Sequence, residues 1–316
     1  MNFMNLFENP QFWFGVFRSM TPILLAALAA MVATRCGITN MAIEGTMTFS
    51  ALFGVLGAHW FGSVWLGLLL AILIGVVVSL FLAYFKLQMG ADEVLVGIAI
   101  NLLAAGATIF ILYLVTGDKA SSSSIPPKLL PFIHIPLIKD IPFIGKVISG
   151  QSIIVYFSFV LVLMMNFLLF KTPLGLRIRS VGSNPHASES VGVFVNKTRY
   201  IAMLISGILA GIAGAYMSMG YMSIFTKGMI AGRGFIGLAA SNVGGVAPFG
   251  GLLAALLFGF FESLGNNLQS VSTLPAEFIL MIPYITTIIA YTIFSYRRLT
   301  AKKRKAKQLA ENAAKI

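Results

Sequence analysis

Two glycine-interrupted apolar stretches carry the polar side chains best placed to do chemistry. The first, GITNMAIEGTM, holds Asn40 and Glu44, whose spacing of four would put them on one face of a helix. The second, GMIAGRGFIGLAASNVGG, holds Arg233 and Asn242, and Asn101 is a weaker candidate between them. Amide and ionic groups are costly in apolar surroundings and mark functional sites there, where they would bind a polar solute. The structural alternative is that they pair internally or cap free backbone groups.

Catalytic alternatives have little support in the residues. GRGFIG, from Gly232, matches G-x-G-x-x-G but lacks a preceding strand, and the next acid, Glu262, itself a weaker polar candidate, lies in another apolar run. No phosphate-binding G-x-x-x-x-G-K-[ST] occurs, and His59, His134 and His186 lie in separate regions. A membrane enzyme would need clustered catalytic or metal-binding residues. We expect no enzyme, and interpret the two broken stretches as the solute path of a transport protein with two related halves.

The composition requires membrane-spanning elements to position these residues. Of 316 residues, 58% are apolar and 10% are charged, and the mean hydropathy is +0.91, which excludes an ordinary soluble core. We predict an all-α polytopic transmembrane helix bundle of about nine spans, within a range of eight to ten, because 37–58 and 228–251 could be full spans or broken helices. The predicted spans are 11–34, 39–58, 62–85, 94–116, 151–170, 201–222, 230–247, 249–267 and 277–296.

The positive charge follows membrane topology rather than a nucleic-acid partner. The formal net charge is +12, and basic residues within the segment 171–200 flank its polar stretch, while others follow the last predicted span. The positive-inside rule makes both regions cytoplasmic, in agreement with the four predicted spans between them. We assign 1–298 to a transmembrane domain and 299–316 to a basic cytoplasmic tail that suits anionic lipid headgroups. Arg18, within the first apolar run, is expected to reach an interface or to face other helices.

Residues 117–150 form the long extramembrane loop of the first half. Five prolines, at 126, 127, 131, 136 and 142, exclude a regular helix there. One predicted span separates this loop from the cytoplasmic segment, so the loop should lie outside. Its Ile, Leu and Phe residues suit either a cover over the outer end of the bundle or a docking surface for an external protein.

The polar segment RSVGSNPHASESVGV is predicted to contain a short helix with both ends marked. Asn184 is a favoured N-cap, Pro185 suits the first helical position, and Gly192 can take the left-handed conformation that ends a helix. Residues 186–191 would form the turns between them. Such a helix could fit a groove on a peripheral protein, and an ordinary capped loop is the alternative.

Three blocks together resemble the bacterial ABC-importer permeases that serve nucleosides and simple sugars. They are GITNMAIEGTM, TPLGLRIRSVGSNPHASESVGV and GMIAGRGFIGLAASNVGGVAPFGGLLAALLFGFFESL, in the family's order, and the resemblance covers roughly 20–296. The superfamily also includes ribose, galactose and branched-chain amino-acid permeases. The first and third blocks favour the nucleoside group, whose external receptors are lipoproteins.

The resemblance implies a non-catalytic importer subunit in the bacterial cell membrane, with a cytoplasmic C-terminus, that works by alternating access. ATP and Mg²⁺ would bind a separate ATPase subunit, so this chain would hold no cofactor. The other partners would be a second permease chain, expected to be a homologue, and an external substrate-binding lipoprotein. Nucleosides are the expected substrate. Ribose, galactose and riboflavin are alternatives, and an ion-coupled secondary transporter is a remote one.

The same resemblance makes the capped segment the coupling helix that docks on the ATPase. Its residues would be Gly182, Ser183, Asn184, Pro185, His186, Ala187, Glu189 and Gly192. Ser183 and His186 depart from the family pattern, which leaves partner specificity open. The substrate path would be lined by Asn40, Glu44, Asn101, Arg233 and Asn242.

Overall fold

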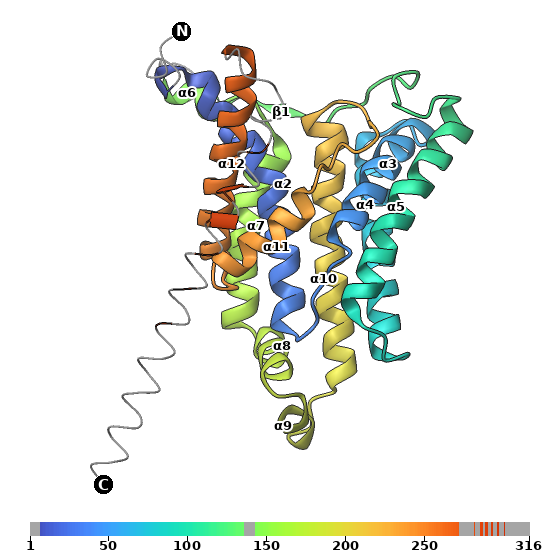
Figure 1. The fold of residues 1–316 in the computed structure, drawn as a ribbon, viewed down its shortest axis with the longest axis vertical. Coiled ribbons are helices and arrows are strands. Elements are labelled where there is room, and N and C mark those ends of the chain that lie inside the picture. The colour runs from blue at the N-terminus through green and yellow to red at the C-terminus, as the bar shows by residue number, and fades with distance from the viewer. Residues whose placement is uncertain are drawn as a thin grey trace.

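The computed structural model describes residues 7–135 and 143–271, together with positions 281, 285, 286, 288, 289, 292, 296 and 300. The predicted last span, 277–296, and the basic tail, 299–316, therefore lie largely outside the described residues. In the part that is described, nearly all regular structure is helical, as the all-α prediction requires (Figure 1).

Helices dominate the chain from its first described residues onward. Among the described residues, six helical segments are long and apolar enough to cross a membrane, namely α2, α4, α5, α7, α10 with the π-helix η1, and α12. The full order is α2 (Pro10–Arg35), α3 (Ile43–Trp60), α4 (Val64–Leu87), α5 (Glu93–Thr116), β1 (Phe132–Ile133), α6 (Ile144–Ile148), β2 (Gln151–Ser152), α7 (Ile153–Lys171), α8 (Pro173–Ser183), α9 (Pro185–Ser190), α10 (Val195–Tyr216), η1 (Met217–Tyr221), α11 (Arg233–Val243) and α12 (Pro248–Val271).

The two glycine-interrupted stretches form shorter helices. α11 has 11 residues and rises only about 16 Å, roughly half of a hydrocarbon layer. The full span predicted at 230–247 is therefore wrong, and the broken-helix alternative holds. α3 has 18 residues and is not among the six described helices that are long and apolar enough to cross a membrane. Figure 1 shows α3 and α11 both starting near the middle of the bundle, and the count of nine spans stays a prediction.

α2 runs through the interior of the bundle. Every residue from Ser19 to Ala33 is buried, and α10, α11 and α12 all pack against this helix. A helix that is apolar all round is expected in such a position. α4 and α5 instead turn large apolar side chains outward, such as Leu73 (58% exposed) and Leu102 (70% exposed). These outward faces suit contact with lipid tails.

The first part of the outer loop lies on the bundle. The Ser122 N–H donates to the carbonyl of Phe225, and the Phe225 N–H donates to the Ser122 hydroxyl, both at 2.9 Å. The Leu130 N–H donates to the carbonyl of Met219, in η1, at 3.0 Å. β1 pairs antiparallel with β2, just before α7. These contacts fit a covering role for the loop, and a docking role stays a prediction.

α4 and α10 meet through glycines. A Cβ added to Gly75 would lie 2.5 Å from the carbonyl oxygen of Gly207, and one added to Gly207 would lie 2.7 Å from that of Gly75. No side chain fits at such distances. Close backbone approach at small residues is how helices associate in lipid, where apolar side chains gain nothing by leaving the hydrocarbon.

We expect Gly75→Ala to lower the free energy of unfolding by about 1–3 kcal/mol, because the added methyl group would overlap backbone atoms of α10. Thermal unfolding of the purified protein in detergent measures this change. Gly106→Ala is the matched control, because nothing lies within 4 Å of a Cβ built on Gly106, which is also inside a spanning helix. Equal melting temperatures for the two variants would contradict this packing.

Candidate functional site

A carboxylate from α3 caps the start of α11. Glu44 Oε1 accepts a hydrogen bond from the Gly232 N–H and Oε2 accepts one from the Gly234 N–H, both at 2.8 Å. The first N–H groups of a helix have no partner within it and form the positive end of its dipole, so a carboxylate is a favourable partner. A Cβ on Gly234 would lie 2.7 Å from the Glu44 Cα, so only glycine permits this approach. Glu44 therefore has the internal partner that the structural alternative required.

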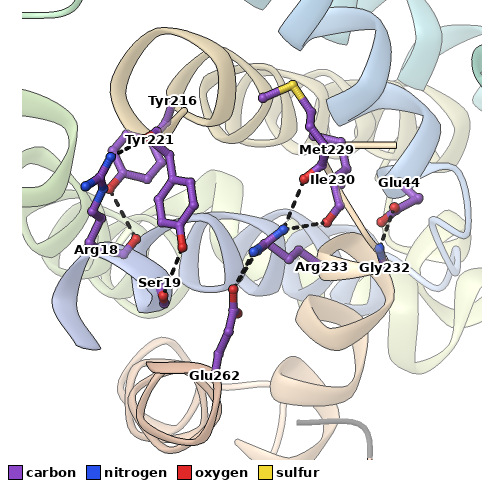
Figure 2. Close-up of polar contacts among 10 residues, drawn as sticks. All are labelled: Arg18, Ser19, Glu44, Tyr216, Tyr221, Met229, Ile230, Gly232, Arg233 and Glu262. Atoms are coloured by element: carbon purple, nitrogen blue, oxygen red, sulfur yellow. Dashed lines mark hydrogen bonds and ion pairs between the residues drawn. The ribbon is translucent and has the colours of Figure 1, made fainter. Parts of the chain in front are cut away.

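Arg233, the first residue of α11, ties this helix to α12. Its Nε donates to Glu262 Oε1 at 3.0 Å, and its Nη2 forms an ion pair with the same oxygen (Figure 2). Its Nη1 donates to the carbonyls of Met229 and Ile230, each at 3.1 Å. The two charged side chains are only 12% and 8% exposed. Arg233 thus pairs with a buried carboxylate and also satisfies carbonyl groups of the turn before its own helix.

Tyr221, the last residue of η1, lies between two arginines (Figure 2). The Arg18 guanidinium lies 4.8 Å from the centre of the Tyr221 ring and donates to the Tyr221 carbonyl, and that of Arg233 lies 5.5 Å from the ring centre. The Tyr221 hydroxyl and the Ser19 hydroxyl are 3.3 Å apart. We call Arg18, Glu44, Tyr221, Arg233 and Glu262 the central polar cluster.

The chemistry open to the central polar cluster is hydrogen bonding and ion pairing. It contains two cations and two carboxylates, so its formal charges balance. In the ranges that the structure describes, no group of three or more His, Cys, Asp or Glu side chains could hold a metal ion. A polar solute passing at this depth would find donors, acceptors and one aromatic ring.

Tyr216 replaces a hydrogen bond that α2 lacks. Pro22 lies inside α2 and has no N–H, so the carbonyl of Arg18, four residues earlier, loses its helical donor. The Tyr216 hydroxyl, from the fully buried end of α10, donates to that carbonyl at 3.1 Å (Figure 2). The backbone of α2 is therefore satisfied from another helix beside the central polar cluster.

Asn101, on α5, supports the start of α3. Its Oδ1 accepts from the Gly45 N–H at 2.7 Å, and its Nδ2 donates to the Met41 carbonyl at 2.9 Å. α3 has no side-chain cap of its own, because Ala42 stands at its N-cap position. Asn101 therefore does for α3 what Glu44 does for α11.

Asn40 and Asn242 lie away from the central polar cluster. Asn40 is fully buried and donates to the Ser206 hydroxyl of α10 at 3.0 Å. It precedes α3, which begins only at Ile43, so the prediction that Asn40 and Glu44 share a helix face is wrong. Asn242 lies nine residues after Arg233, or about 14 Å along α11. Of the five predicted path residues, only Glu44 and Arg233 meet in one cluster.

Sequence reasoning missed Tyr221 and gave Glu262 too little weight. A charge inside an apolar run is visible in a sequence, as for Glu262 and Arg18, but its partner is not. Arg18 does face other helices, which was one of its two expected placements. Its partner Tyr221 lies 203 positions away, and a tyrosine in an apolar run gives no signal of its own.

The predicted capped helix is α9, at the end of the bundle opposite the outer loop (Figure 1). Asn184 Oδ1 accepts from the Ala187 N–H at 3.1 Å, and Gly192 has a φ of +80°. These features confirm the predicted cap and stop signals. Beside α9, Val191 and Phe194 are each 78% exposed. An open hollow of about 810 Å³ lies between α9 and the start of α10.

The C-terminal end of α2, the lower end in Figure 1, contacts α8. A Cβ on Gly182, at the end of α8, would overlap the carbonyl oxygen of Arg35, so the two backbones touch. Arg35 Nε donates at 2.8 Å to the carbonyl of Val246, in the turn between α11 and α12. Arg199 Nε, from α10, donates to the Cys36 carbonyl at 3.4 Å. Three separate elements therefore meet at the same end of α2.

Comparisons with known proteins extend over most of the chain. The family model described as "Branched-chain amino acid transport system / permease component" matches residues 12–291. The guanosine ABC transporter permease protein NupQ of Bacillus subtilis (strain 168) is 41% identical over 288 residues, which cover 86% of this chain and 88% of that protein. The nucleoside ABC transporter permease protein NupC of Lactococcus lactis subsp. cremoris (strain MG1363) is 34% identical over 292 residues, which cover 89% and 91%.

Two further comparisons concern a second permease and the fold. The guanosine ABC transporter permease protein NupP, also of Bacillus subtilis (strain 168), is 28% identical over 315 residues, which cover 93% of this chain and 87% of that protein. A solved structure described as a metal-chelate type ABC transporter in an inward-facing conformation matches with a TM-score of 0.50 and 16% identity, covering 90% of this chain and 85% of that one. The structural match concerns the fold alone.

We expect Glu44→Gln to lower the free energy of unfolding by about 1–3 kcal/mol, because the amide NH₂ would face a backbone N–H that now has an acceptor. Thermal unfolding in detergent and the level of folded protein in the membrane measure this. Asp92→Asn is the matched control: Asp92 caps α5 at an exposed position, where asparagine caps equally well. A Glu44→Gln variant that folds like the parent but fails in transport would instead indicate direct contact with the solute.

Proposed function

We propose that this chain, which belongs to the family of branched-chain amino acid transport system permease components, is the membrane-spanning subunit of an ATP-binding-cassette importer for nucleosides. The observation that carries the substrate class is the similarity to NupQ and NupC along most of their length. The central polar cluster supports it, because hydrogen-bonding groups at membrane depth suit a polar, uncharged solute better than a metal ion or a lipid. The chain itself does no chemistry, and its sequence has no phosphate-binding loop.

We place the ATPase contact at α9 and its flanks, with the α9 end of the bundle on the cytoplasmic side. Val191 and Phe194, each 78% exposed, are large apolar side chains next to polar loops, and a partner surface would cover them. Arg177 and Lys197 are exposed and basic, so an acidic groove on the ATPase would complement this end. Asn184 and Pro185 give α9 a fixed start, which suits a helix that fits into a groove.

The way in which α9 is joined to the bundle supports alternating access. Motion of α9 would pass to α8, whose Gly182 touches the backbone of Arg35 at the end of α2. Arg35 is bonded to Val246 and so to the turn between α11 and α12. Because α11 carries Arg233, the same displacement would reach the central polar cluster. ATP binding to the partner would thus shift the population of inward- and outward-facing states.

The assembly would include a second permease chain and an external substrate-binding lipoprotein. Two guanosine permease proteins from one organism among the relatives support pairing with a homologue rather than with a copy. A duplicated, inverted architecture is part of this proposal. In Figure 1 the long α2 runs one way and is followed by the short α3, whereas the long α10 runs the other way and is followed by the short α11. The span predicted at 277–296 would complete the second half and lead to a cytoplasmic tail.

Uptake of radiolabelled uridine and adenosine, in cells with and without this gene, tests the substrate class. Deletion of the gene should abolish uptake. In the strain that keeps the gene, unlabelled ribose, galactose or riboflavin should not compete. The background strain should have no second nucleoside transporter. Nucleoside uptake that is unchanged in the deletion strain would refute the nucleoside assignment and turn the choice to a sugar or riboflavin.

We expect Asn184→Gly combined with Pro185→Gly to weaken ATPase binding roughly three- to tenfold. The reason is that a flexible start destabilises the short helix by about 1 kcal/mol. Co-purification with the ATPase and ATP-driven uptake are the measurements. Pro126→Gly with Pro127→Gly, exposed in the outer loop, is the matched control and should leave binding unchanged. Equal ATPase binding by both double variants would count against α9 as the docking helix.

A further inference from the structure

Glu262 uses only one of its two carboxylate oxygens. Both hydrogen bonds from Arg233 end on Oε1, whereas Oε2 is buried and has no hydrogen-bond partner among the described residues. Glu262 as a whole is only 7% exposed. An ionised carboxylate can accept about four hydrogen bonds, and an oxygen without a partner away from water is unfavourable. A buried acceptor without a partner in the chain is available to water or to a bound solute.

The donors drawn around Glu262 in Figure 2 each make another hydrogen bond. Arg233 donates its remaining Nη1 to the carbonyls of Met229 and Ile230. Arg18 donates to the Tyr221 carbonyl, and the Tyr221 hydroxyl is shared with Ser19. Figure 2 shows Tyr221, Arg233 and Glu262 pointing toward one another from three different elements. None of these donors bonds Oε2 in this conformation, so the oxygen is open to a donor on a bound solute, whereas an anion would be repelled by the carboxylate.

The segment that separates Tyr221 from Arg233 is strained. Ser223 has a φ of +70° and Ala231 a φ of +50°, in the left-handed region that residues with a Cβ seldom adopt. The π-helix η1 ends directly before this segment. Strained backbone and π-helical turns concentrate at ligand-binding and switching sites. The segment leads into Arg233, the partner of Glu262, so a change in this backbone would alter the surroundings of the Glu262 carboxylate.

We propose that Glu262 Oε2 accepts a hydrogen bond from a sugar hydroxyl of the transported nucleoside, while Arg233 holds the other oxygen in place. The inference rests on the nucleoside permease proposed above and adds the group that recognises the ribose. A hydroxyl is a neutral donor, so it satisfies the free oxygen without adding charge to a balanced cluster. Nucleosides that lack that hydroxyl would leave the oxygen unpaired and would be transported poorly.

The test is competition of [³H]uridine uptake by uridine, 2′-deoxyuridine, 3′-deoxyuridine and 2′,3′-dideoxyuridine. With the parent protein, at least one deoxy analogue should compete roughly 10- to 100-fold less well than uridine, as expected for losing a hydrogen bond to a charged group. In Glu262→Gln this discrimination should fall to about threefold or less, because the neutral amide would make a weaker hydrogen bond with the hydroxyl than the charged carboxylate does. Glu262→Asp keeps the charge and should retain part of it. Asp92→Asn changes the exposed N-cap of α5, outside the central polar cluster, and should keep the discrimination of the parent.

Two results would overturn the inference while leaving the proposed function intact. One is a parent protein that treats uridine and all three deoxy analogues alike, which needs no variant and so does not depend on folding. The other is a Glu262→Gln variant whose uptake of every nucleoside falls by one common factor, because Glu262 would then only support the helix pair. A parent protein that imports no nucleoside at all would refute the proposed function, and this inference with it.

Discussion

The need to satisfy backbone N–H groups inside the membrane shapes everything around α3 and α11. The first turn of a helix that starts inside the bundle is surrounded by protein, so protein atoms have to bond its N–H groups. Asn101 serves α3, and Glu44, itself in the first turn of α3, serves α11. One side chain thus joins the two helix starts. Because each cap comes from another element, neither start could shift along the sequence without leaving N–H groups unpaired.

The buried charges follow from the same break. The turn before α11 leaves carbonyl groups free, and Arg233 takes two of them while it pairs with Glu262. Balanced ion pairs in an apolar interior add little net stability, because the desolvation of both partners offsets their attraction. Their presence fits the solute-binding role proposed for the central polar cluster. The long-range contacts of α2, by contrast, are mostly apolar or made by glycines, and these carry the packing.

Local signals in the sequence predicted local structure well. The N-cap at Asn184 and the stop at Gly192 depend on neighbouring residues, so both could be found without a fold. The start of α3 could not, because it depends on Asn101, a side chain of another helix, and Asn40 was placed on the wrong side of that start. For α11, glycines indicated a break but not its position. The pairing of Glu262 with Arg233, and of Arg18 with Tyr221, depends on how α2, α12 and η1 pack, which no short pattern encodes.

Pro22 has a mechanical consequence for α2. A proline within a helix removes one hydrogen bond of the ladder, and here the carbonyl it leaves free is bonded to Tyr216 of α10 instead. Bending α2 at that turn would therefore disturb one hydrogen bond fewer than bending an uninterrupted helix. The half that bears Arg35 touches Gly182 of α8, so a tilt of α8 would act on α2 beyond this turn. α2 would then act as a hinge at Pro22, and the Tyr216 hydroxyl of α10 would bond the free carbonyl at that point.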